Sequence, residues 1–151
     1  KKIGNNKNIN IKNYGKNHPG GNIGYVLNTS VRYIMKTDSL PIIESNITLK
    51  ETLFIMTKFK QSFILYVENE ILIGILTDGD LRRSLNNNNN FNIKIKELIN
   101  HNFKFVFEDD LISKIILEFR NSPYLNSCIP VVNSNQNLKG IINNNILINY
   151  K

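Results

Sequence analysis

The residues best suited to chemistry lie in one run near the middle of the chain, Gly74-Ile-Leu-Thr-Asp-Gly-Asp-Leu-Arg-Arg. Thr77 and Asp80 are three residues apart, the spacing at which a hydroxyl and a carboxylate satisfy the free backbone amides of a helix start. In that structural role the pair would only cap the helix. The same geometry also suits a nucleotide, because free amides and the Thr77 hydroxyl can hold a phosphate while Asp80 accepts both hydroxyls of a ribose. Gly79 would let such a ligand approach the backbone.

The other chemically active side chains give weaker signals. Arg82 and Arg83 follow the motif and could meet a ligand phosphate or face solvent; we assign the ligand role to Arg82. His101 lies in a polar turn with no other ligand-type residues beside it, and Cys128 lies in an apolar run that favours a small buried side chain over a nucleophile. With one cysteine and no Cys/His cluster, we expect no metal site and no cofactor.

The segments on either side of the motif predict a regular succession of elements. Apolar patterning and turn signals predict a strand at 41–43, a helix at 49–59 capped by Thr48, strands at 63–67 and 71–76 joined by a turn at 68–70, and a helix at 78–85. The alternating Phe103, Phe105 and Phe107 predict a further half-buried strand.

The same order of elements recurs in the second half of the chain. Residues 31–35, 62–67 and 74–81 match 95–99, 127–132 and 140–147, with a solvated asparagine run at 86–90 between the copies. Each copy is expected to run strand, helix, strand, strand, helix over a length near the lower limit for an independent core. Two copies would bury their sheets by packing together, so we expect an α+β fold built as one module.

The V-x-x-I-M opening at Val31, the repeated unit and the G-x-x-T-x-x-D motif resemble cystathionine-β-synthase-type (CBS) domains in tandem. The resemblance implies a CBS pair that binds adenosine nucleotides or related ligands in clefts between its units, with Thr77 on phosphate and Asp80 on ribose. In the second copy Asn143 replaces the threonine and Ile146 replaces the aspartate, which leaves no carboxylate for a ribose. We therefore expect one competent nucleotide site at most.

A narrower resemblance rests on the upstream segment His18-Pro-Gly-Gly-Asn-Ile-Gly24 together with the motif at 77–83. It is similar to bacterial D-arabinose 5-phosphate isomerases, in which such a segment joins an N-terminal sugar-isomerase domain to a C-terminal CBS pair. The resemblance implies interconversion of D-ribulose 5-phosphate and D-arabinose 5-phosphate, for the Kdo sugar of lipopolysaccharide. It also implies that His18 is a catalytic residue of the isomerase domain, which this chain lacks; alternatively, His18 is only a turn residue before proline.

These observations predict a regulatory tail: a linker at 1–30, one CBS unit at 31–90 and a second at 91–151. Because the chain begins at Lys1 rather than Met, we expect it to be cut from a longer, cytoplasmic isomerase and to bind without catalysing. The expected partners are a nucleotide or sugar-nucleotide ligand, the parent's sugar-isomerase domain, and further copies in a CBS-mediated dimer or a parent tetramer. The alternative is a free-standing CBS sensor of adenine nucleotides.

Composition excludes several other classes of function. The net charge of +7, from 19 basic and 12 acidic residues, is spread along the chain without interleaved aromatics, so we expect no nucleic-acid partner. No apolar run approaches the roughly 18 residues of a membrane span, and no secretory leader precedes the predicted core, so we expect no membrane partner. The abundance of asparagine, isoleucine and lysine fits a bias towards A/T-rich codons.

Overall fold

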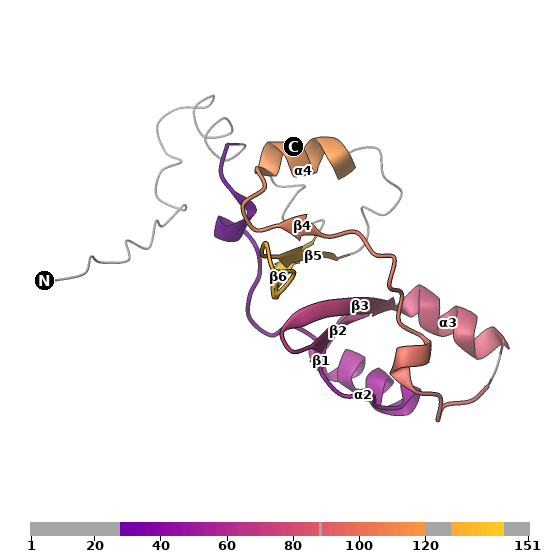
Figure 1. The fold of residues 1–151 in the computed structure, drawn as a ribbon. Helices are drawn as coiled ribbons and strands as arrows, with labels where there is room; N and C mark the ends of the chain where they lie inside the picture. The colour runs from indigo at the N-terminus through magenta and orange to yellow at the C-terminus, as the bar shows by residue number, and fades with distance from the viewer. Residues whose placement is uncertain (1–27, 88, 120–127, 144–151) are drawn as a thin grey trace, which may run out of the picture.

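The computed structural model describes residues 28–87, 89–119 and 128–143, and within them the fold is α+β as predicted. Two three-stranded sheets lie next to each other, with helices on their outer sides (Figure 1). The elements in chain order are η2 Val31–Tyr33, β1 Ile42–Ile43, α2 Leu49–Phe59, β2 Phe63–Glu68, β3 Ile71–Thr77, α3 Asp78–Asn87, η3 Ile95–Glu97, β4 Val106–Phe107, α4 Ile112–Phe119, β5 Ile129–Val132 and β6 Leu138–Ile142. We call β1–β3 with α2 and α3 the first layer, and β4–β6 with α4 the second layer.

The two sheets have the same topology, which agrees with the sequence repeat. In each sheet the first strand runs parallel to the middle strand and the third runs antiparallel to it. Each hairpin also has one irregularity at a matching place, between Tyr66 and Val67 and between Val131 and Val132. The predicted last helix of the second repeat, Ile146, most of the linker and His18 lie outside the described residues.

The middle strand β2 is buried on both faces, so its side chains build two different cores. Ile64 and Tyr66 point into the core beneath α2 and α3, while Phe63, Leu65 and Val67 belong to a cluster that also contains residues of β5 and β6. This second cluster joins the layers, because it combines those three with Leu72, Val132 and Ile141. Burying both faces requires a nearly continuous apolar run, as β2 has.

The opening segment of each repeat packs in the layer formed by the other repeat. Val31 is fully buried in the second layer's core, and Lys36 and Ile141 exchange two backbone hydrogen bonds of 2.9 Å. In the same way Ile95 is fully buried in the first layer's core, and Asn100 and Ile75 exchange two backbone hydrogen bonds of 2.7 and 3.1 Å. The boundaries of the two CBS units, 31–90 and 91–151, stay a prediction. In the structure, each layer contains the opening segment of the opposite repeat.

Two local predictions are wrong. The phenylalanine alternation does not form a strand beyond Val106–Phe107, and the buried side chain there is Val106, at 2% exposure, while Phe105 and Phe107 are exposed. β4 pairs with β5 over two residues, and among the described residues the segment before β4 has no strand neighbour. The asparagine run also does not begin the connector, because Asn86 and Asn87 still belong to α3.

Candidate functional site

The candidate site lies where β3 ends at Thr77 and α3 begins at Asp78. Leu76 and Leu81, on either side of this junction, are both buried in the first layer's core. The backbone amide of Asp78 donates a hydrogen bond of 2.8 Å to the carbonyl oxygen of Ser62 at the start of β2. The junction is therefore held from both sides, and the side chains of the motif project from a fixed turn of backbone.

Thr77 and Asp80 form the capping box that their spacing predicts. Asp80 Oδ2 accepts from the Thr77 backbone amide at 2.9 Å and from the Thr77 hydroxyl at 2.6 Å, and the Asp80 amide donates to Thr77 Oγ1 at 3.3 Å. The structural interpretation of the pair is thus confirmed. It does not exclude a ligand, because these bonds leave Asp80 Oδ1 outside the box.

The arginine beside this carboxylate is Arg83. Its guanidinium lies 2.5 Å from Asp80 Oδ1, whereas the Arg82 guanidinium lies 3.4 Å from Asp78 Oδ2. The structure therefore brings Thr77, Gly79 and Asp80 together and directs Arg82 to a different carboxylate. The signal that could have identified Arg83 is its i,i+3 spacing from Asp80 within one helix.

Gly79 lies within this cluster and leaves space there. A Cβ added at Gly79 would lie 3.4 Å from one guanidinium nitrogen of Arg83 and 3.7 Å from Thr77 Oγ1, both ordinary contact distances. The backbone at Gly79 therefore does not require glycine. The groups nearest to this added Cβ are the Arg83 guanidinium and the Thr77 hydroxyl, so polar side chains border the backbone at Gly79.

The Asp80 carboxyl is held in its ionised form. Burial by itself raises its pKa, but the hydrogen bonds from the Thr77 hydroxyl and amide and the neighbouring Arg83 together lower the pKa below its usual value. Because the pKa is lower in the folded state, Asp80 stabilises the fold above its unfolded pKa of about 3.9. That contribution is lost as the pH falls through the lower, folded-state pKa.

A second capping box in the same layer shows what a purely structural pair looks like. Thr48 and Glu51 at the start of α2 make the same three contacts, with Glu51 Oε2 accepting from the Thr48 amide and hydroxyl at 2.7 Å each. Glu51 is exposed and has no arginine within ion-pair distance among the described residues. The Thr77–Asp80 box differs from it in having a guanidinium on its second carboxylate oxygen and an 81% buried carboxylate side chain.

Cys128 and His101 lie outside the Thr77–Asp80 cluster. Burial raises the pKa of the Cys128 thiol to about 12, so this side chain behaves as a small apolar group and not as a nucleophile at neutral pH. His101 has one ring nitrogen 3.2 Å from the carbonyl oxygen of Ile73. Within residues 28–87, 89–119 and 128–143 no group of three or more histidine, cysteine, aspartate or glutamate side chains could hold a metal ion. In this same part of the chain, no helix has the length and apolar character needed to cross a membrane.

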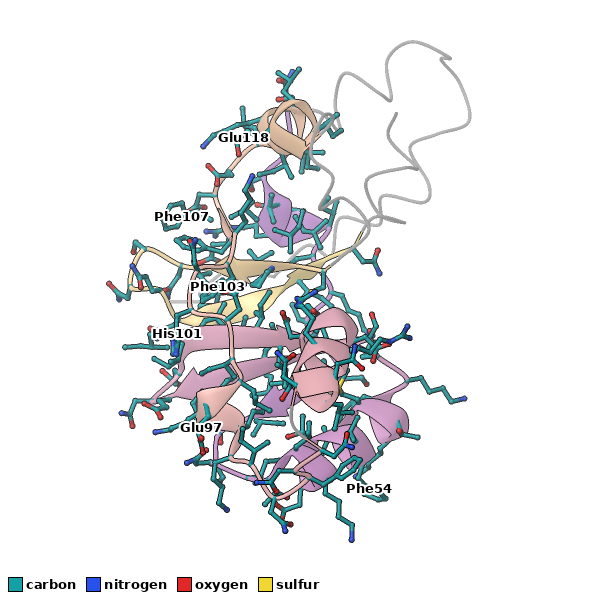
Figure 2. The ribbon with its side chains drawn as sticks, turned by 90° about the vertical axis from the view of Figure 1, so that its right-hand side faces the viewer. Phe54, Glu97, His101, Phe103, Phe107 and Glu118 are labelled. Atoms are coloured by element: carbon teal, nitrogen blue, oxygen red, sulfur yellow. The ribbon has the colours of Figure 1, made fainter. Side chains whose placement is uncertain are left out.

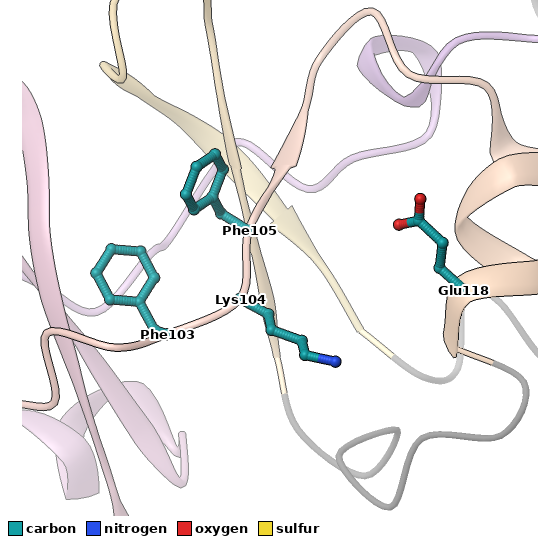
Figure 3. A pocket seen from close by; sticks show the side chains of 4 residues that line it. All are labelled: Phe103, Lys104, Phe105 and Glu118. Carbon is teal, nitrogen blue, oxygen red and sulfur yellow. The ribbon is translucent and has the colours of Figure 1, made fainter.

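A hollow in the second layer lies apart from this site. It has a volume of about 440 Å³ and is lined by Phe103, Lys104, Phe105 and Glu118. Phe103, Lys104 and Phe105 come from the segment before β4, and Glu118 faces them from α4 (Figure 3). The two aromatic rings stand 6.1 Å apart, but the hollow contains no residue of the Thr77–Asp80 motif.

Comparisons with known proteins find relatives that match most of this chain. It is 31% identical to a probable arabinose 5-phosphate isomerase of Haemophilus influenzae over 90% of this chain and 40% of that protein. It is 28% identical to the arabinose 5-phosphate isomerase KdsD of Francisella tularensis over 94% of this chain and 43% of that protein. The chain thus spans about two-fifths of the length of these two relatives.

Solved structures share the fold. A CBS domain-containing protein of unknown function from Bacillus anthracis superposes with a TM-score of 0.71 at 13% identity, covering 83% of this chain and 94% of that one. The CBS domain pair of protein MJ0100, solved in complex with 5′-methylthioadenosine and S-adenosyl-L-methionine, gives a TM-score of 0.66 at 25% identity, over 80% and 98%. The CBS domain family model matches residues 31–87 and again 95–150, so the chain belongs to the CBS domain family and carries two such domains in tandem.

Proposed function

We propose that this chain is the regulatory CBS pair of an arabinose 5-phosphate isomerase and that it binds an adenosine nucleotide at the β3–α3 junction. The observation that carries the proposal is the cluster of Thr77, Asp80 and Arg83, which places a hydroxyl, an ionised carboxylate and a guanidinium together beside Gly79 at the start of α3. The two adenosine compounds bound by the CBS pair of MJ0100 support the ligand class. The two named isomerase relatives support the parent enzyme.

In the proposed complex Arg83 changes partner. Its side chain is 70% exposed, and within the part of the chain that the structure describes its ion pair is with Asp80, so it can turn towards a phosphate at little cost. That movement frees Asp80 Oδ1 to accept the ribose hydroxyls, while Oδ2 stays fixed by Thr77. Thr77 would thus keep the carboxylate oriented, and Arg83 would supply the charge that a phosphate requires. Arg82, bound to Asp78 on an exposed face, keeps its predicted role only if it also turns towards the ligand.

Removing the carboxylate is expected to weaken nucleotide binding. Calorimetry with AMP, ATP and S-adenosylmethionine should show binding to the wild type, and a loss of at least about tenfold in affinity for Asp80→Ala, since a charged hydrogen-bond acceptor is worth about 1.5–3 kcal/mol. Both Asp80→Ala and Glu51→Ala remove the carboxylate half of a capping box, so both variants lose the same kind of structural contact. Glu51→Ala is therefore the matched control and should bind like the wild type.

The result is decided by the pair of variants. If Asp80→Ala binds every nucleotide as the wild type does, or if Glu51→Ala loses as much affinity as Asp80→Ala, the motif is only a helix cap and the proposal fails.

The pH dependence of binding should differ between adenosine and AMP. The lowered pKa of Asp80 keeps its carboxylate ionised throughout the range from pH 8 to pH 5, so the affinity for adenosine should stay constant there. The AMP phosphate carries a second ionisation near pH 6, so AMP should bind more weakly at pH 5 than at pH 8 as Arg83 faces a smaller charge. Titrations at four pH values would check this, and a fall in adenosine affinity between pH 7 and pH 5 would contradict the role given to Asp80.

The parent enzyme's chemistry is proposed to lie in a domain that this chain does not contain. His18 is proposed to act there as a catalytic residue, on the strength of the segment that contains it. We further propose that the nucleotide bound at the first layer regulates that domain, and that the parent assembles as a homo-oligomer in the cytoplasm.

A further inference from the structure

The outer face of α2 carries a stripe of four side chains at helical spacing: Glu51, Phe54, Ile55 and Lys58. Residues three, four and seven apart lie on the same side of a helix, so the stripe runs for about 10 Å along α2. The residues that α2 buries in the core are different ones: Leu49, Thr52 and Met56. The stripe is therefore the side of α2 that the core does not use.

Phe54 is the most prominent residue of the stripe. It is 72% exposed, the highest value among the large apolar residues that the structure describes, and Figure 2 places it at the edge of the molecule. Beside it lies an open groove of about 710 Å³ whose apolar lining is Ile47, Phe54 and Ile55. The same face thus combines an exposed ring with an apolar hollow next to it, which makes it able to receive a second copy of itself.

The two ends of the stripe carry opposite charges. Hydrogen bonds from the Thr48 amide and hydroxyl, followed by the nearby charge of Lys94, lower the pKa of the Glu51 carboxyl, so this exposed side chain is ionised at neutral pH. Both bonds use Glu51 Oε2, and among the described residues Oε1 accepts no hydrogen bond. Lys58, at the other end, forms no ion pair within 4 Å in the part of the chain that the structure describes.

The order of these four residues fits a second α2 that runs in the opposite direction. If a two-fold axis passes between Phe54 and Ile55, Glu51 of each copy faces Lys58 of the other. Phe54 of each copy then faces Ile55 of the other, so the interface contains two ion pairs around an apolar centre. A parallel arrangement would set Glu51 against Glu51 and Lys58 against Lys58, which like-charge repulsion disfavours.

Other occupants fit the stripe less well. A small ion would leave the Phe54 ring exposed. A peptide with charges of one sign would meet one favourable and one unfavourable end of the stripe. The mixed charges and the apolar centre are matched together by the stripe itself in reverse order.

α4, the equivalent helix of the second repeat, lacks this pattern. Phe54 and Leu117 are each the sixth residue of their helices, and Leu117 is also exposed, at 68%. In α4, however, Glu118 takes the place of Ile55, and it lies 3.9 Å from Lys114 of the same helix. An antiparallel pair of α4 helices would therefore have a carboxylate at its apolar centre, so self-association is expected through α2.

We propose that two copies of this chain associate through an antiparallel pair of α2 helices, with Phe54 against Ile55 and Glu51 against Lys58 across a two-fold axis. One helix from each copy forms the contact, so the buried area is at the low end for protein interfaces and the dissociation constant is expected between about 1 μM and 1 mM. The proposal names the face behind the proposed homo-oligomer. It does not require a nucleotide at the Thr77–Asp80 motif, so nucleotide binding and self-association can each fail without the other.

The test is sedimentation equilibrium of the whole chain over a range of protein concentrations. The average mass of the wild type should rise from 17.4 kDa towards twice that value. Phe54→Ala should weaken association by about tenfold or more, because it removes the central apolar contact from both sides of the axis.

The decisive measurement mixes two charge variants. Glu51→Lys alone would place two lysines at each contact, and Lys58→Glu alone would place two glutamates there, so each should associate at least about tenfold more weakly than the wild type. In a one-to-one mixture the mixed dimer has one lysine and one glutamate at each contact, so association should return. A role of either residue in the folding of its own chain would not be rescued in this way.

The controls are matched to these changes. Leu117→Ala truncates an exposed apolar side chain at the equivalent place in α4, and Lys139→Glu reverses an exposed charge on β6; both should associate like the wild type. Glu51→Lys also removes a carboxylate from the α2 capping box. If circular dichroism shows that this variant unfolds at a lower temperature, Lys58→Glu and Phe54→Ala, which leave the box intact, decide the test.

Four outcomes would overturn the proposal. The wild type stays monomeric up to about 1 mM, or Phe54→Ala and Lys58→Glu associate as the controls do. The third is that the mixture of folded charge variants associates no more than its components. The fourth is a wild type that stays monomeric but binds phosphatidylserine vesicles through Phe54, which would assign the stripe to a membrane surface.

Discussion

Replacing Ile95 by alanine is expected to loosen the first layer, although Ile95 belongs to the second sequence repeat. Its side chain is fully buried in a core with Leu49, Ile64 and Tyr66. Truncating a buried isoleucine to alanine removes apolar contacts and leaves a cavity, so the free energy of unfolding should fall by about 2–5 kcal/mol. Urea unfolding measures this loss, and hydrogen exchange shows where it is felt: the β2 amides should lose more protection than the β5 amides.

The reciprocal variant is Val31→Ala. Val31 lies in the first repeat but is fully buried against Val106, Ile115 and Val131 in the second layer. Val31→Ala should therefore reduce the protection of the β5 amides before that of the β2 amides. The free energy of unfolding should fall by less than for Ile95→Ala, because truncating valine removes less apolar volume than truncating isoleucine. Leu117→Ala, at an exposed position, should leave both strands protected. If each variant instead lost amide protection first in the layer of its own repeat, the opening segments would not stabilise the opposite layers in solution.

This crossing of segments has a consequence for the proposed regulation. Thr29 and Ser30 pair with Ile112 and Leu111 of the second layer, so this part of the chain lies beside α4 and not beside the Thr77–Asp80 motif (Figure 1). A signal from Thr77 and Asp80 to a domain upstream would therefore have to cross the apolar cluster between the sheets. Because Leu65 and Val67 of β2 meet Val132 and Ile141 there, a shift of β2 would be passed on to the second sheet.

The elements predicted from the sequence are those whose determinants are local. Thr48 and Thr77 cap their helices through carboxylates three residues away. The turn of the first hairpin falls at Asn69 and Glu70, which both have positive φ values, as a tight hairpin requires. The Thr77–Asp80 geometry could be predicted for the same reason, since both partners and their backbone amides lie within one turn.

The features that could not be predicted depend mostly on contacts between segments that are far apart in the sequence. Nothing in the spacing around Ile95 indicates that it packs under α2, because the pairing of Ile95 with Ile47 joins residues of different repeats. The phenylalanine alternation failed for the same reason: a strand needs a neighbour, and only Val106 and Phe107 have one. The sequence could not decide between the two arginines, because Arg82 is four residues from Asp78 and Arg83 is three from Asp80, so each has a carboxylate at helical spacing; the structure shows which one lies beside the capping box.

Gly140→Ala is expected to destabilise the module more than the same change at the equivalent Gly74. A Cβ at Gly140 would lie 2.6 Å from the carbonyl oxygen of Lys36, and one at Gly74 would lie 3.0 Å from that of Asn100. Both contacts are with the backbone of a crossing segment, which cannot yield as a flexible side chain can. At Gly140 the methyl group would push away the segment at Lys36, which exchanges two backbone hydrogen bonds with Ile141. We expect this to lower the free energy of unfolding by about 1–3 kcal/mol.

Gly79→Ala is the control, because the same methyl group is added without a backbone obstacle. Its nearest neighbour is the end of the exposed Arg83 side chain, at 3.4 Å, and alanine favours a helix over glycine by up to about 1 kcal/mol. Urea unfolding should therefore rank stability as Gly79→Ala at or above the wild type, then Gly74→Ala, then Gly140→Ala. If Gly140→Ala were as stable as Gly79→Ala, the segment around Lys36 could not lie against β6. Gly74 and Gly140 would then have no structural reason to recur at matching positions of the repeat, where each allows the backbone of a crossing segment to pass close by.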